Sequence, residues 1–151
     1  MEKFHTSIVI NASPEKVWNI MLGKDTYREW TKAFNPASDY EGGWEQGAKI
    51  KFIGVDEQNN SMGGMVSRIA ESRPYEFVSI EHLGIVLPDG TEDTTSEEAR
   101  KWSPAFENYT FTAKDGGTEL SIDQDIGAEY KEEFEKMWSE ALKALKELAE
   151  Q

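Results

Sequence analysis

The stretch Asn11-Ala12-Ser13-Pro14-Glu15-Lys16-Val17-Trp18 marks the point where a strand ends and a helix begins. The segment before it, Phe4–Ile10, ends in a β-branched run and predicts a first strand. Ser13 is a favoured N-cap residue, and Pro14 suits the first helical position because an N–H would have no partner there. Apolar residues then recur at helical spacing up to Gly23 and predict a short amphipathic helix: Val17, Trp18, Ile20 and Met21.

The middle of the chain changes from helical to strand patterns. A second short helix is predicted over Asp25–Thr31, with Asp25 or Thr26 as its N-cap. Residues 56–60 and Asp115–Gly117 are short enough to connect hairpins, which predicts an antiparallel meander. The predicted strands are Lys49–Val55, Met62–Glu71, Tyr75–Gly84, Glu107–Lys114 and Thr118–Asp125, with a further short strand near Ala37–Tyr40.

After Gly127 an uninterrupted helical pattern runs towards the end of the chain. At 1.5 Å per residue this helix is roughly 30 Å long, enough to cross a sheet from end to end. The order of elements predicts an α+β fold in which one curved antiparallel sheet wraps around the terminal helix, in a single domain over residues 1–151. The apolar stripe of this helix consists of Tyr130, Phe134, Met137, Trp138, Ala141, Leu142, Leu145 and Leu148.

Composition limits the classes of partner. The net charge is −13, from 29 acidic and 16 basic residues, so the protein repels phosphate backbones and nucleic acid is not expected to bind. The absence of cysteine excludes disulfides and thiol chemistry. No apolar run approaches the ~18 residues of a membrane span and residues 1–11 lack a leader pattern, which favours a soluble cytoplasmic protein without membrane insertion. Nucleotide, zinc-protease and nucleophile-elbow motifs are also missing, so we expect no cofactor, no metal and no catalytic residue set.

The segment 11–18, followed by Tyr27, Trp30 and the run of strands, resembles the opening of the START-like, or Bet v 1-like, helix-grip superfamily. Within it the chain is most similar to the branch of Hsp90 ATPase activator homologues, over nearly its full length. The resemblance implies a sheet of about seven strands around the terminal helix, two short supporting helices, and a cavity between sheet and helix. Members bind lipids, sterols, polyketides or hormones, and some catalyse cyclisation or dehydration, so the fold does not give the function.

Strand alternation selects the candidate ligand-binding residues. Glu107, Tyr109 and Phe111 share one face of their strand, and Gln124 shares a face with apolar neighbours in the next strand. Phe52 has the same relation to Ile50 in an earlier strand. If these faces are concave, Glu107 and Gln124 are polar groups among apolar walls, as is usual in ligand sites.

The strand Tyr75–Gly84 is ambiguous because both of its faces carry apolar residues. Either Glu81 or His82 faces inward, and both remain candidates. His82 has a side chain that titrates near neutrality, although a lone histidine is more often structural.

Aromatic residues complete the candidate site. Trp30 and Trp102 are predicted at the pocket mouth, whereas Phe134 and Trp138 reach it from the helix stripe. The long connection 85–104 is a candidate lid. Two glycine pairs, Gly42-Gly43 and Gly63-Gly64, are interpreted as turns or strand bends.

Three functions fit this sequence. The first is binding of a small hydrophobic ligand, such as a lipid, a polyketide or an aromatic molecule. The second is a cyclase or dehydratase that uses an inward carboxylate or His82 for proton transfer. The third is an interaction module with a chaperone partner or a weak homodimer. Binding is preferred to catalysis because no pair of catalytic groups is evident.

Overall fold

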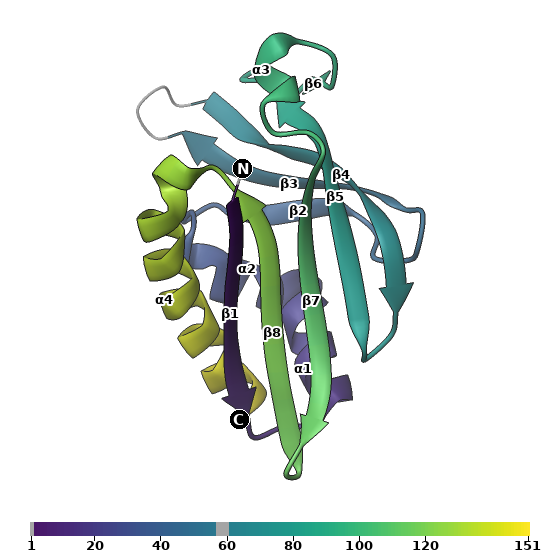
Figure 1. Ribbon diagram of the computed structural model, residues 1–151, viewed down its shortest axis with the longest axis vertical. Helices are drawn as coiled ribbons and strands as arrows, with labels where there is room; N and C mark the ends of the chain where they lie inside the picture. Colours follow the sequence, from purple (N-terminus) through teal and green to yellow (C-terminus); the bar gives the residue numbers. More distant parts are fainter. Residues whose placement is uncertain (1, 57–60) are drawn as a thin grey trace.

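The computed structural model describes residues 2–56 and 61–151. The predicted order of a strand, two short helices, a run of strands and a long terminal helix is present (Figure 1). The elements are β1 (Glu2–Ile10), α1 (Pro14–Leu22), α2 (Lys24–Trp30), the 3-10 turn η1 (Thr31–Ala33), β2 (Asp39–Gly42), β3 (Lys49–Asp56), β4 (Ser61–Arg73), β5 (Phe77–Val86), β6 (Glu92–Asp93), α3 (Glu97–Arg100), β7 (Ala105–Lys114), β8 (Gly117–Ile126), η2 (Ala128–Tyr130) and α4 (Lys131–Ala149).

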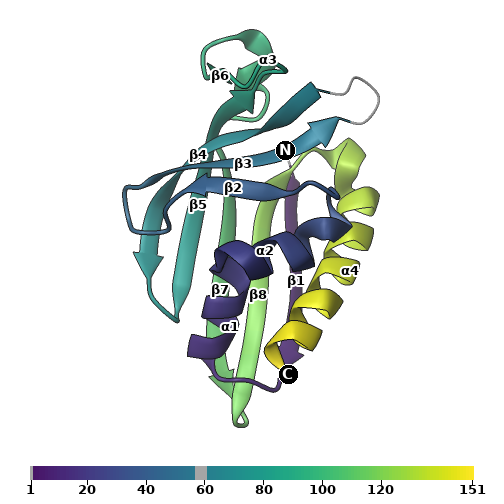
Figure 2. The same ribbon diagram turned by 180° about the vertical axis from the view of Figure 1, so that it is seen from behind.

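The strands form one antiparallel sheet in the order β1-β8-β7-β5-β4-β3-β2, with the short β6 paired to β5. The sheet curves around α4, which lies on its concave side together with α1 and α2 (Figure 2). Two register shifts between β4 and β5, at Val66/Ser67 and Ile69/Glu71, are bulges that increase the local bend. This arrangement is the helix-grip fold, with the α+β architecture predicted from the sequence.

The start of α1 follows the sequence signal. Ser13 is the N-cap, and its Oγ accepts a hydrogen bond of 3.2 Å from the Lys16 N–H. The start of α2 differs from the prediction, because the helix begins one residue earlier and Gly23 is its N-cap. The Thr26 hydroxyl instead donates back to the Ile20 carbonyl at 2.5 Å, across the junction of the two helices.

Turns at the strand ends explain two boundaries. Asp115 and Gly116 have φ of 50° and 83°, which gives the tight turn that was predicted between β7 and β8. Tyr75 has φ of 70° and belongs to the turn before β5, so this strand starts later than predicted. The other predicted hairpin, residues 56–60, falls mostly outside the described residues.

The core lies between α4 and the sheet and is tightly filled at one end. Leu120 and Ile122 of β8 are fully buried there, as is Leu145 of α4. The α4 stripe was predicted correctly where it is deepest, and burial of each such side chain contributes ~1.5–3 kcal/mol to folding. The buried α4 residues are Trp138, Ala141, Leu142, Leu145 and Ala149.

Candidate functional site

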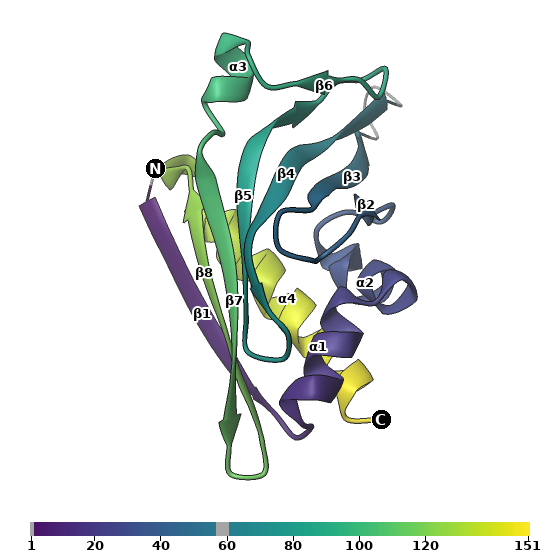
Figure 3. The same ribbon diagram turned by 90° about the vertical axis from the view of Figure 1, so that its right-hand side faces the viewer.

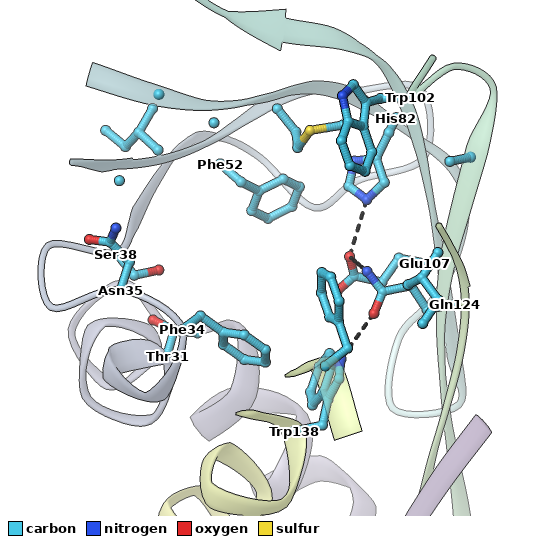
Figure 4. Close-up of a pocket in the computed structure, with 18 of the residues that line it drawn as sticks. Thr31, Phe34, Asn35, Ser38, Phe52, His82, Trp102, Glu107, Gln124 and Trp138 are labelled. Atoms are coloured by element: carbon cyan, nitrogen blue, oxygen red, sulfur yellow. Dashed lines mark hydrogen bonds and ion pairs between the residues drawn. The ribbon is translucent and has the colours of Figure 1, made fainter. Parts of the chain in front are cut away.

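A cavity of about 450 Å³ occupies the other end of the space between sheet and helices. Its walls come from η1 and the loop after it, from β3 and β4, from β5, β7 and β8, and from the first turns of α4. Figure 4 shows Phe34 and Phe52 across the cavity from Glu107 and Gln124. The lining residues used below are Tyr27, Trp30, Phe34, Phe52, Gly54, Gly63, His82, Trp102, Glu107, Tyr109, Gln124, Asp125, Phe134 and Trp138.

A missing side chain on β4 helps to keep this space open. Gly54 and Gly63 lie opposite each other in the ladder, and both line the cavity. A Cβ atom added at Gly63 would meet no heavy atom within 4 Å. The next residue, Gly64, has φ of 144°, and a Cβ there would lie 1.8 Å from the Phe52 carbonyl oxygen. Gly63 therefore leaves part of the cavity open, whereas Gly64 is required because its backbone conformation leaves no room for a Cβ atom.

Glu107 stands at the centre of a polar cluster on one wall (Figure 4). Its Oε1 lies 3.1 Å from His82 Nε2 and accepts a hydrogen bond of 3.2 Å from Gln124 Nε2. Its Oε2 accepts a hydrogen bond from the Tyr109 hydroxyl. We refer to the connected side chains Ser67, His82, Glu107, Tyr109, Gln124 and Trp138 as the Glu107 cluster.

The outer members of the cluster fix its orientation. Trp138 Nε1 donates to Gln124 Oε1 at 2.9 Å, which turns the Gln124 amide N–H towards Glu107. Ser67 is fully buried, and its Oγ lies 2.7 Å from His82 Nδ1, its one side-chain partner in the described structure. The Ser67 hydroxyl has an acceptor if His82 is neutral with its proton on Nε2, so we assign that tautomer. Three neutral donors then converge on the Glu107 carboxylate.

Burial and negative charge shift the acidity of two tyrosines beside this carboxylate. Burial, followed by the charge of Glu107, raises the pKa of Tyr109 well above its usual value of 10.0. The same two causes, in the same order, raise the pKa of Tyr27. Both phenols therefore stay neutral at any physiological pH.

A second carboxylate, Asp125, lies at the edge of the cavity. Its Oδ2 accepts a hydrogen bond of 2.9 Å from the Phe106 N–H, and Lys3 forms an ion pair with it. Burial alone would raise the pKa of Asp125, but Lys3 and the Phe106 N–H hold it below its usual value. The negative charge of Asp125 is thus balanced by Lys3, which does not line the cavity. Among the described residues, Glu107 has no such Lys partner.

Comparison with known proteins places this architecture in a family. The family described as Activator of Hsp90 ATPase homolog 1-like protein matches residues 11–150. The chain belongs to this family. Among curated proteins, none matches the sequence.

Solved structures share the fold of this family member at low sequence identity. The Aha1 dimer from Colwellia psychrerythraea superposes with a TM-score of 0.71 at 18% identity, covering 99% of this chain and 97% of that one. A protein from Chromobacterium violaceum gives a TM-score of 0.70 at 19% identity, with the same coverage of both chains. A protein from Cytophaga hutchinsonii gives 0.69 at 18% identity, covering 98% and 93%. These similarities establish the fold alone.

Nine of the eleven candidate ligand-binding residues predicted from the sequence of this family member line the cavity. They are Trp30, Phe52, His82, Trp102, Glu107, Tyr109, Gln124, Phe134 and Trp138. Their position fits the prediction, whereas their role in binding stays a prediction. The structure also selects His82, and not Glu81, as the inward residue of β5. Glu81 instead pairs with Arg68, with a distance of 2.8 Å between Oε1 and Nη2.

Two further placements differ from the sequence prediction. Phe111 lies outside the cavity and packs against Trp18, with 5.2 Å between ring centroids. Trp30 is 1% exposed and donates from Nε1 to the Met21 carbonyl, so it forms the floor and not the mouth. Trp102 fits the mouth better, because it is half-buried and its ring centroid lies 5.6 Å from that of Tyr130.

Several site features were missed from the sequence. Gly63-Gly64 lies inside β4, which agrees with the strand-bend alternative, but the open space at Gly63 was not predicted. Ser67 and Asp125 had no signal, because their importance depends on partners far away in the chain.

The segment 85–104 contains β6 and α3, and α3 packs against the end of β5 (Figure 3). Only Trp102 from this segment lines the cavity, and a lid role stays a prediction. No helix in the described residues is long and apolar enough to cross a membrane.

Proposed function

We propose that this protein binds a small hydrophobic molecule in the cavity between β3, β4 and α4. The observation that carries the proposal is the combination of aromatic walls with one convergent polar cluster around an open volume of about 450 Å³. Ligand pockets typically have volumes of ~300–1,000 Å³ and consist of apolar walls with few polar groups. The cavity therefore has the size and the chemistry of a ligand site.

Packing energetics support the same function. Unfilled interior volume lowers stability, because lining atoms lose dispersion contacts and apolar burial. The filled end of the same core shows that α4 and the sheet pack closely elsewhere. Gly63 leaves open space in the wall, which a larger residue would fill. A bound apolar molecule would restore the missing contacts.

The direct test is native mass spectrometry of the purified protein before and after organic extraction, combined with titration of the neutral dye Nile red. We expect a bound species or saturable dye uptake. The variant Gly63→Leu places a side chain into the cavity and should weaken dye binding on the order of tenfold. The control Ala113→Leu adds the same side chain at an exposed position of β7, outside the cavity, and should leave binding unchanged. Absence of both bound mass and dye uptake in the native protein would refute the proposal.

A second candidate function is acid–base catalysis on a bound, polyketide-like substrate. The observation that favours it is the approach of His82 Nε2 to Glu107 Oε1 at the cavity wall, 3.1 Å apart. Ser67 cannot act as a nucleophile there, because it is fully buried behind His82 and does not line the cavity. Mass spectrometry of a linear poly-β-ketone after incubation would reveal cyclised or dehydrated product. The native protein should form this product faster than the Glu107→Gln variant. Equal rates for the two proteins would contradict this candidate.

We also propose a partner and a location for this protein. The Colwellia structure is a dimer, and the family description refers to an activator of the Hsp90 ATPase. A weak homodimer, a chaperone partner, a cytoplasmic location and a single domain over residues 1–151 are consistent with these comparisons and with the acidic composition.

A further inference from the structure

The Glu107 carboxylate has acceptor capacity left on the cavity side. Its two oxygens together offer about four acceptor positions. Oε1 is used by His82 and Gln124, and Oε2 is used by Tyr109 alone. Glu107 also lines the cavity, and 14% of its side chain is exposed there. A ligand therefore meets an acceptor and not a donor at this point of the wall.

Among the described residues, no Lys or Arg side chain pairs with this acceptor. With His82 in the neutral tautomer assigned above, all three donors to Glu107 are uncharged. Asp125 also lines the cavity, and its Lys3 partner reaches it from the surface. Among the described residues that line the cavity, none is Lys or Arg. A partly buried carboxylate without a cation favours a positive charge in the space before it.

Aromatic rings that line the cavity add to the same preference. Phe34 lies 4.9 Å from Trp138 and Trp30 lies 5.9 Å from Trp138, measured between ring centroids. Phe52 stands on the other wall, facing Glu107 across the cavity (Figure 4). The faces of such rings carry negative electrostatic potential and attract cations, whereas they repel carboxylates.

We propose that the ligand is a hydrophobic amine, whose ammonium group donates to Glu107 while its apolar body contacts the aromatic walls. This inference rests on the proposed binding function and adds the polar end of the ligand to it. The site discriminates against hydrophobic carboxylates, because the Glu107 carboxylate lines it and no Lys or Arg is present among the described residues of its wall.

The test compares three probes with one apolar body: 2-naphthylmethylamine, 2-naphthylmethanol and 2-naphthoate. Each is titrated by calorimetry against the native protein at pH 7, and each is also used to displace Nile red. We expect the amine to bind on the order of tenfold more tightly than the alcohol, and the carboxylate more weakly than both. The preference should decrease at high salt, because it is electrostatic.

The variant Glu107→Gln keeps the size of the side chain and removes its charge. It should abolish the amine preference, so that the amine and the alcohol bind the variant with similar affinity. The probe ranking of the native protein tests the same idea if this variant does not fold. Carboxylate binding as tight as amine binding, or an amine preference that persists in Glu107→Gln, would overturn the inference while leaving the binding function intact. Failure of every probe and of Nile red to bind would instead refute the binding function itself.

Discussion

Two adjacent glycines of β4 should respond in opposite ways to the same substitution. Gly63 lines the cavity, and an added Cβ would meet no atom within 4 Å. Gly64 has φ of 144°, and an added Cβ would approach the Phe52 carbonyl oxygen to 1.8 Å. The variants Gly63→Ala and Gly64→Ala therefore form a matched pair, one residue apart in the same strand.

The structure gives the sign and size of both effects. Replacing Gly63 by Ala reduces the entropy of the unfolded chain without strain, so the free energy of unfolding should rise by about 0.5 kcal/mol. Replacing Gly64 forces a non-glycine residue into a disfavoured backbone region, which costs ~1–3 kcal/mol even before the clash with Phe52 is relieved. The two variants should thus differ by roughly 3 kcal/mol, which corresponds to about 6–12 °C in Tm for a domain of this size.

Urea unfolding followed by far-ultraviolet circular dichroism measures this difference, provided that the m-value is the same in both variants. Equal m-values mean that both variants expose the same surface area on unfolding, so that their unfolding midpoints can be compared as free energies. A loss of more than ~1 kcal/mol in Gly63→Ala would show that its Cβ position is occupied, which contradicts the open wall. A Gly64→Ala variant as stable as the native protein would contradict the backbone geometry of β4.

Two further predictions concern the Glu107 cluster. Trp138→Phe removes the donor to Gln124, so the free energy of unfolding measured by urea denaturation should fall by ~1–3 kcal/mol. A decrease below ~0.5 kcal/mol would contradict this hydrogen bond. Burial, followed by the charge of Glu107, raises the pKa of Tyr109, so the folded state resists phenolate formation. The contribution of Tyr109 to the free energy of unfolding is therefore fully present below pH 10.0 and decreases as the pH rises above it. Urea titrations at several alkaline pH values should show a smaller fall in Tyr109→Phe, with Tyr27 accounting for the rest, and equal falls would refute this assignment.

The sequence contained enough information for the architecture and for most of the cavity wall. Ser13 and Pro14 indicated the start of α1, and the stripe of α4 indicated which helix the sheet would enclose. Alternation placed Glu107 and Gln124 on the inner face, because neighbouring strands with apolar residues at fixed parity must turn them to the same core.

Strand alternation predicts the face on which a residue lies, but it could not predict which inward residues are close enough along the strand to line the cavity. Phe111 shares the inner face with Glu107, but four residues of strand separate them by ~13 Å. That distance carries Phe111 out of the cavity to Trp18. The inner face of β5 was also ambiguous, because Phe77 and Leu83 on the opposite face are apolar and are partly buried as well. Tertiary packing, and not local pattern, decides between His82 and Glu81.

The two ends of the α4 interface meet opposite requirements with the same elements. At the filled end, Leu120 and Leu145 exclude solvent and supply stability. At the open end, Gly63 has no side chain to fill the cavity, and three neutral donors hold the Glu107 carboxylate in place. Substitutions that improve packing at the open end should raise stability and lower ligand affinity together, because the same volume serves both. That coupling is what distinguishes a cavity kept for a ligand from a packing defect, since filling a defect would raise stability without any loss of binding.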